Sequence, residues 1–126
     1  MKSSRYKLWP ALALVATCFL PGASAAQNAA AGRALFEANC QDCHGVNGDG
    51  NGPAAEEFYL KPRDFAMAAF KFDTDADWER GTDTDLANVI RHGPGAYGGS
   101  PLMPAWSDLN DGEVKSLIEF IRSLES

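Results

Sequence analysis

Cysteine, histidine and basic side chains are scarce in this sequence, and their scarcity excludes several classes of protein. The 126 residues include three cysteines, two histidines and 11 lysines and arginines against 17 aspartates and glutamates, so the net charge is −6. The phosphates of DNA and RNA repel an acidic surface, and we therefore expect no nucleic-acid partner. The sequence also shows no internal repeats, and its length supports one domain.

The first residues have the pattern of a secretory signal peptide. Three basic side chains precede an apolar run over residues 8–20, which the small-residue stretch Ala23-Ser24-Ala25 follows. We expect cleavage after Ala25, which makes residues 1–25 a signal peptide and residues 26–126 the mature domain. The apolar run is shorter than the roughly 20 residues that a membrane-spanning helix needs. The alternative is a retained leader, which would attach the protein to a membrane.

Removal of this leader changes both the charge and the cysteine count. It removes three basic residues and no acidic ones, which leaves eight basic and 17 acidic residues and a net charge of −9. Such a surface would suit a partner with a basic docking patch, although acidity also keeps an exported protein soluble. Cys18 leaves with the leader, so Cys40 and Cys43 are the two cysteines of the mature domain, in an oxidising compartment.

Three stretches of the mature domain have helical patterns. The first helix is predicted over residues 29–39. The second is predicted to begin near Thr84 and to end before Gly93, with apolar residues recurring three and four positions apart. The third is predicted to begin after Asn110, a good N-cap, and to carry one apolar stripe to the C-terminus. We therefore predict an all-α fold with three main helices.

Long, glycine-rich loops separate these helices. Residues 45–53 and 93–104 are predicted to be loops. Residues 56–60 could form a short helix, which Pro62 would end. A domain of about 100 residues with loops of this length has little internal core. Something other than side chains should fill its centre.

Residues 40–44, Cys-Gln-Asp-Cys-His, form the C-x-x-C-H motif that attaches c-type haem. The two thiols add across the two vinyl groups of the porphyrin, and a spacer of two residues matches the separation of those groups. The adjacent His44 is then held beneath the ring, where one imidazole nitrogen can bind iron. One haem c, bound through Cys40 and Cys43, would also fill the centre of the domain.

Two other uses of a C-x-x-C pair fit the sequence less well. A zinc site needs two further ligands, and the mature domain offers only His92 and carboxylates for them. A thioredoxin-like dithiol needs a βαβ setting, and no strand pattern surrounds this pair.

Three side chains are candidates for the second axial ligand of the iron. Met67 lies in an apolar stretch where a thioether is usually packing material, and His92 lies at a predicted helix end where an exposed histidine is expected. Met103 lies in a loop between Pro101 and Pro104, which restrict its backbone and could project the sulfur at a fixed point. Met103 is preferred, while His92 and a five-coordinate iron stay open.

Further residues follow the order that is typical of class I monohaem cytochromes c, and residues 32–124 resemble that family. The matching features are Gly32 and Phe36 before the pentad, Gly52-Pro53 after it, Leu86-x-x-Val89-Ile90-Arg91-x-Gly93, Met103-Pro104-Ala105-Trp106, and Phe120-Ile121-Arg122 near the end.

The resemblance implies the cytochrome c fold, with three main helices and long loops wrapped around one covalently bound haem. The N- and C-terminal helices would cross where Gly32 allows close approach to Phe120. His44 would be the proximal ligand and Met103 the distal one, and the carbonyl of Pro53 would accept the Nδ1–H of His44.

Other residues receive roles from the resemblance as well. Arg63 or Arg91 could pair with a haem propionate, and Tyr97 and Trp106 would pack near the haem edge. The acidic segment 73–79 and the loop 94–100 have no counterpart in the family pattern.

The function that these features imply is electron transfer. We expect a periplasmic one-electron carrier that exchanges electrons with redox proteins, makes and breaks no substrate bond, and is therefore not an enzyme. A methionine ligand would favour the reduced iron and raise the potential. The alternatives are a haem subunit of a larger oxidoreductase and a five-coordinate haem sensor or catalyst.

Overall fold

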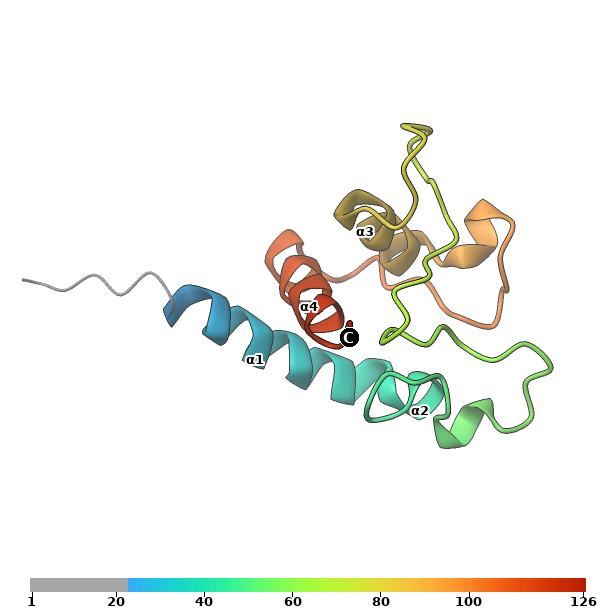
Figure 1. Cartoon of the computed structure of the whole chain (residues 1–126), viewed down its shortest axis with the longest axis horizontal. Helices are drawn as coiled ribbons and strands as arrows, with labels where there is room; N and C mark the ends of the chain where they lie inside the picture. The colour runs from blue at the N-terminus through green and yellow to red at the C-terminus, as the bar shows by residue number, and fades with distance from the viewer. Residues whose placement is uncertain (1–22) are drawn as a thin grey trace, which may run out of the picture.

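The structure, a computed structural model, describes residues 23–126 and contains only helices and loops over that range (Figure 1). The elements in chain order are α1 (Ala23–Asn39), α2 (Gln41–His44), the 3₁₀ helix η1 (Pro53–Ala55), α3 (Asp83–His92), the 3₁₀ helix η2 (Pro94–Tyr97) and α4 (Asp111–Ser123). The all-α prediction is confirmed. The predicted leader falls largely on residues 1–22, outside the described residues, and cleavage after Ala25 stays a prediction.

The first and last helices pack against each other, as the family resemblance implied (Figure 1). Gly32 of α1 lies against the backbone of α4, where a Cβ atom would overlap the carbonyl oxygen of Ser116 and lie 2.9 Å from the Cβ of Phe120. A glycine is therefore required for this approach. Phe36, one turn later, is fully buried with its ring 5.2 Å from that of Phe120.

The hydrophobic core lies where α1, α3 and α4 meet. Residues of α4 that recur three and four positions apart supply five of its nine residues, as the predicted stripe requires. The buried apolar cluster consists of Phe36, Phe65, Leu86, Ile90, Val114, Leu117, Ile118, Phe120 and Ile121. The core is small for the length of the chain, which agrees with the long loops seen in the sequence.

Both α3 and α4 begin with a capping box, and the N-cap predicted at Asn110 is confirmed. Thr82 is the N-cap of α3 and forms a reciprocal capping box with Asp85, and Asn110 does the same for α4 with Glu113. Gly93 ends α3 with a φ of 73°. The helix predicted near Thr84 therefore begins one residue earlier, at Asp83.

The short helix considered for residues 56–60 does not form. A 3₁₀ turn lies just before it, over Pro53–Ala55, with the proline at the first helical position. An N–H group at that position has no partner within the helix, so its absence from proline costs no hydrogen bond. The single-turn elements α2 and η2 were not predicted. Among the helices of the described range, none is both long enough and apolar enough to cross a membrane.

Candidate haem-binding site

The two cysteines lie on one helical turn that continues directly from α1. Cys40 is the N-cap of α2, and its carbonyl oxygen accepts from the backbone N–H of Cys43 at 3.2 Å and of His44 at 2.9 Å. Residues three apart on a helix lie on the same side, so the two sulfurs face one direction. Both are half-buried free thiols. The pentad is thus held in one fixed turn beside the core.

His44 is buried and its imidazole is held from three sides. Its Nδ1 lies 3.3 Å from the carbonyl oxygen of Arg63. The ring of Phe65 stacks on it with centroids 4.7 Å apart and planes 15° apart, and the ring of Phe36 is tilted against it at 6.5 Å. With Nδ1–H donating to Arg63, Nε2 keeps a free lone pair, which is the form of imidazole that binds a metal.

This hydrogen bond corrects one implication of the family resemblance. The carbonyl of Pro53 was expected to accept from His44 Nδ1, and the structure gives that place to Arg63. Pro53 is exposed at the start of η1, whereas the loop that carries Arg63 folds back over the pentad. Phe65 N–H donates to the Gly48 carbonyl at 2.8 Å, and a Cβ at Gly50 would overlap the carbonyl oxygen of Pro62.

Burial shifts the pKa of two residues of the pentad, His44 and Cys40. Burial lowers the pKa of His44, opposed by the hydrogen bond to the Arg63 carbonyl, so the imidazole is neutral at physiological pH. Burial, with a smaller contribution from the neighbouring Cys43, raises the pKa of Cys40 to about 11. A neutral imidazole is the form that binds iron.

The candidates for the second axial ligand lie in three places. Met103 is half-buried in the loop between η2 and α4. Met67 is 73 % exposed in the loop that follows Phe65, and His92 is exposed at the C-terminal end of α3. The Met103 loop is attached to α3 at two points: Gly93 packs against the Met103 carbonyl, and Trp106 N–H donates to the Ile90 carbonyl at 2.9 Å.

Comparison with known proteins decides the family. The family model for cytochrome c oxidase, cbb3-type, subunit III matches residues 27–121. The chain belongs to this family of c-type cytochromes. Its cofactor is therefore haem c, with Cys40 and Cys43 placed as the attachment residues.

A solved structure is similar to this cytochrome as well. It is a chain of the Kuenenia stuttgartiensis reducing HAO-like protein complex Kustc0457/Kustc0458, with a TM-score of 0.62 and 28 % sequence identity. The similarity covers 75 % of this cytochrome and 41 % of that chain, so the cytochrome spans less than half of its relative. No protein of curated function matches the sequence.

The structure separates the two arginines that were candidates for a haem propionate. In this cytochrome Arg91 donates to Asp111 Oδ1 at 2.6 Å and to the Leu109 carbonyl at 3.4 Å, which joins the end of α3 to the start of α4. Arg63 is half-buried and makes no ion pair among the described residues. Arg91 is thus a structural link, and its propionate role is not supported.

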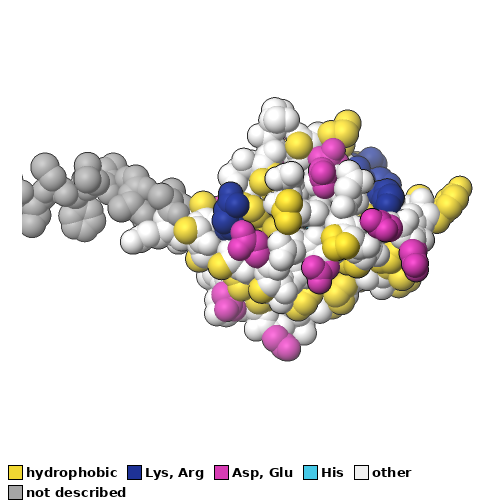
Figure 2. All heavy atoms as spheres, turned by 90° about the horizontal axis from the view of Figure 1, so that it is seen from below, with side chains coloured by type: hydrophobic (Ala, Val, Ile, Leu, Met, Phe, Trp, Pro, Cys, Tyr) yellow, Lys and Arg dark blue, Asp and Glu magenta, His cyan; other side chains and the backbone are white. Residues whose placement is uncertain are grey.

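The aromatic residues expected near the haem edge also have contacts within the protein. The ring of Tyr97 in η2 lies 6.4 Å from that of Phe72, and Trp106 is half-buried against the hydrophobic core. On the face formed largely by α1 and α2, Figure 2 shows acidic side chains scattered among apolar ones.

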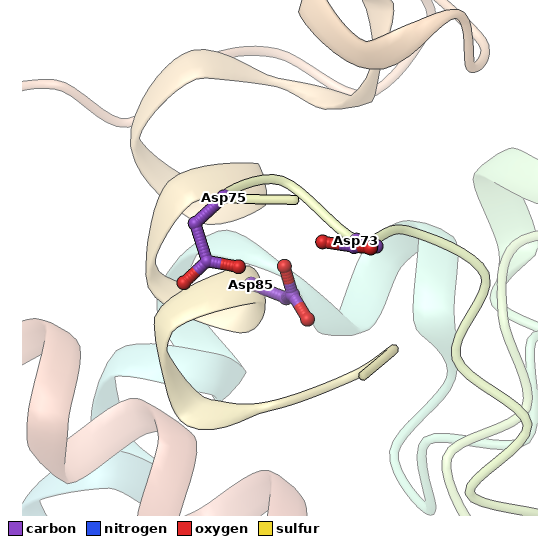
Figure 3. A group of neighbouring side chains, drawn as sticks. All are labelled: Asp73, Asp75 and Asp85. Carbon is purple, nitrogen blue, oxygen red and sulfur yellow. The ribbon is translucent and has the colours of Figure 1, made fainter. Parts of the chain in front are cut away.

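Sequence reasoning missed a cluster of carboxylates in front of α3. Oxygens of Asp73, Asp75 and Asp85 lie within 4.8 Å of one another (Figure 3). Asp85 is 1 % exposed, and its carboxylate accepts hydrogen bonds from the backbone N–H and hydroxyl of both Thr74 and Thr82. Burial raises the pKa of Asp85, but these hydrogen bonds together outweigh it and hold the pKa below its ordinary value. The ionised carboxylate therefore anchors the loop to α3.

Proposed function

We propose that this cytochrome is an exported, periplasmic one-electron carrier in which His44 and Met103 bind the haem iron from opposite faces. The observation that carries the proposal is the state of His44. It is buried, directly follows two free thiols on one turn, and has Nδ1 3.3 Å from the Arg63 carbonyl. This contact leaves Nε2 as the ligand atom.

The residues of the chain contribute attachment and rigidity. Cys40 and Cys43 hold the haem covalently, and Phe65 and Phe36 prevent rotation of the His44 ring. When bound, haem c supplies a one-electron Fe(III)/Fe(II) couple whose potential a methionine ligand raises. His44 is held by packing on one face of the haem and Met103 by a restricted loop on the other, so both ligands should change position little between oxidation states.

Two features support Met103 as the second ligand. Its loop is restricted by the flanking Pro101 and Pro104, and its backbone is tied to α3 through Gly93 and through the hydrogen bond from Trp106 to Ile90. A sulfur on such a loop has a defined position. Met67, on an exposed loop, lacks these constraints.

The test is the absorption spectrum of the purified holoprotein. We expect the ferric form to show the weak near-infrared charge-transfer band of a methionine–iron bond, and Met103→Ala to abolish it. Met67→Ala is the matched control and should keep the band. The assignment is wrong if Met67→Ala removes the band and Met103→Ala keeps it. A high-spin spectrum with rapid carbon monoxide binding would support the five-coordinate alternative instead.

We also infer that the domain makes and breaks no substrate bond and that it acts outside the cytoplasm. The leader pattern of residues 1–25 supports export. The net charge of −9 that remains after its removal supports redox partners with basic docking patches and argues against nucleic acid.

A second candidate function is that of an electron-transfer subunit in a larger oxidoreductase. It is favoured because the matching family is described as an oxidase subunit and the similar solved chain comes from a protein complex. Native purification tests it: a haem absorbance peak that migrates with a second protein at high salt supports a subunit, and a monomeric peak supports a carrier.

A further inference from the structure

The segment of residues 73–79, here named the Trp78 loop, presents a large aromatic side chain to solvent. Trp78 is 93 % exposed and has a φ of 74°, and Ala76 in the same loop has a φ of 60°. A bulky residue with positive φ is uncommon and costs conformational energy that the surrounding structure must offset. Exposure of this indole is therefore imposed by the fold of the loop.

Carboxylates within the loop fix its backbone. Asp73 accepts from the backbone N–H of Asp77 at 3.2 Å and of Trp78 at 3.1 Å, and Asp77 accepts from the N–H of Glu79 at 2.8 Å. None of these bonds uses the indole. The side chain of Trp78 is consequently held out on a preorganised turn, which lowers the entropy that an interaction through it would lose.

The base of the loop is anchored to two helices. Gly81 N–H donates to the Phe72 carbonyl at 3.1 Å and closes the loop, and Asp85 of α3 binds Thr74. Arg122 of α4 donates to the Gly81 carbonyl at 2.6 Å. In Figure 1 the loop projects beyond α3, at the opposite end of the view from α2. Because separation in a projection is a lower limit, the loop lies far from the cysteine turn.

A hollow adjoins Trp78 at the base of the loop. It has a volume of about 410 Å³, and its lining includes the aromatic side chains of Phe72, Trp78 and Tyr97. Lys71 and Arg80 also line it, and neither forms an ion pair with a described residue. The segment 71–80 contains four acidic and two basic residues, so its net charge is −2.

We propose that the Trp78 loop is a docking surface for a partner protein that presents an apolar recess bordered by lysine and arginine side chains. Exposed tryptophans are the residues most enriched among energetic hot spots of interfaces, and acidic residues around such an anchor select a basic partner. Asp75 and Glu79 are exposed and accept no hydrogen bond from a described residue. Glu79 is free to face the rim of the recess, and Asp75, whose oxygen lies within 4.8 Å of those of Asp73 and Asp85, adds to the negative charge behind it.

This inference rests on the proposed function only in that the partner is a redox protein. The loop and the cysteine turn lie at different ends of the molecule, so a redox protein docked through Trp78 leaves the thioether side of the haem accessible to a second redox protein. A second copy of this chain is a poor occupant, because two acidic loops would repel each other.

The experiment uses the full-length holoprotein in its natural host. A photo-crosslinking amino acid replaces Trp78 in one variant and Glu37, exposed on α1, in the control, and adducts are identified by mass spectrometry. The protein that crosslinks at position 78 is then purified and titrated with the cytochrome by calorimetry. We expect one adduct with a basic surface at position 78 and none at position 37.

The binding measurement decides the proposal. Trp78→Ala should raise the Kd of the purified partner at least 10-fold. Asp75→Asn combined with Glu79→Gln should raise it at low salt and flatten its salt dependence, whereas Glu37→Gln combined with Asp108→Asn, which removes the same charge, should change it less than 2-fold. A Trp78→Ala Kd within 2-fold of the wild type, equal adducts at both positions, or an adduct with a second copy of the chain would overturn the proposal.

The haem spectrum of each variant separates this inference from the proposed function. None of these substitutions replaces a residue of the pentad or Met103 itself, so the spectrum should be unchanged in every variant. Loss of docking with a normal spectrum supports the inference. An atypical spectrum in the wild type would refute the proposed function and leave the binding result to stand by itself.

Discussion

Replacing Asp85 with asparagine should destabilise this cytochrome by about 3 kcal/mol, an order of magnitude that follows from its lost hydrogen bonds. The carboxylate is 1 % exposed and accepts from two backbone N–H groups and two hydroxyls, of Thr74 and Thr82. An amide keeps one acceptor oxygen and turns two N–H donors toward groups that also donate. The threonine hydroxyls can rotate toward other acceptors, whereas the backbone N–H groups cannot.

The magnitude follows from the backbone groups alone. The N–H groups of Thr74 and Thr82 bind different oxygens of Asp85, so asparagine keeps one of these bonds and turns its amide NH2 group toward the other N–H group. An unsatisfied buried donor costs about 1–3 kcal/mol, and the donor–donor contact places the loss at the upper end of that range. If all four hydrogen bonds were counted at about 1.5–3 kcal/mol each, the summed destabilisation would be larger than the roughly 4–5 kcal/mol that single substitutions rarely exceed. The smaller figure is therefore the expected one.

The effect should depend on pH in one direction. The pKa of Asp85 in the folded protein lies below its ordinary value, because the hydrogen bonds outweigh the effect of burial. A depressed carboxyl pKa contributes stability above the unfolded value of about 3.9, and that contribution is lost as the pH falls through the folded pKa. The difference in unfolding free energy between the wild type and Asp85→Asn should therefore shrink below about pH 4.

Urea denaturation of the oxidised holoprotein at several pH values is the assay. Asp83→Asn is the matched control, since this acid lies in the same first turn of α3 but has a side chain 74 % exposed in its pair with Arg122. An exposed pair contributes about 0–1 kcal/mol, so the control should be close to the wild type. Equal stability of the two variants, or a difference that grows toward low pH, would refute the role of Asp85 as an anchor.

Two further substitutions test the helix contacts. Gly32→Ala should destabilise the protein by about 2 kcal/mol, because its Cβ would overlap the Ser116 carbonyl and this cost exceeds the roughly 1 kcal/mol that alanine gains in helix propensity. Urea denaturation measures the change, with Ala34→Gly at an exposed position of α1 as the control. A Gly32→Ala protein more stable than the wild type would contradict the close crossing of α1 and α4. Asn110→Ala should lower the free energy of unfolding by about 1 kcal/mol through loss of the α4 cap. Thermal unfolding checks this, with Asp108→Ala as the control because Asp108 takes no part in the capping box. Equal melting temperatures of the two variants would argue against the capping box.

Elements with local signals could be predicted from the sequence. Thr82 forms a capping box with Asp85 at the start of α3, and Asn110 forms one with Glu113 at the start of α4. Both helices begin within one residue of the expected place. A capping box and an apolar stripe involve residues three or four positions apart, so the sequence displays them directly. The crossing of α1 and α4 followed from the family resemblance at Gly32.

Single-turn elements could not be predicted in the same way. Residues 56–60 had a helical composition but form no helix, and η1 lies just before them. One turn of helix gains too few hydrogen bonds to form by itself, so tertiary contacts decide where such turns occur. The turn of α2 occurs because it continues from α1 and buries His44 against Phe36 and Phe65.

The sequence by itself determined the cofactor and the fold class, because both signals are local: the attachment residues Cys40 and Cys43 and the ligand His44 lie within five consecutive residues, and the helical patterns span a few turns each. The tertiary structure alone decided which carbonyl holds His44. Arg63 is 19 positions away and reaches it only because its loop folds back over the pentad. The anchoring of Thr74 by Asp85, 11 positions apart, and the exposure of Trp78 depend likewise on contacts between distant segments, which no spacing along the chain displays.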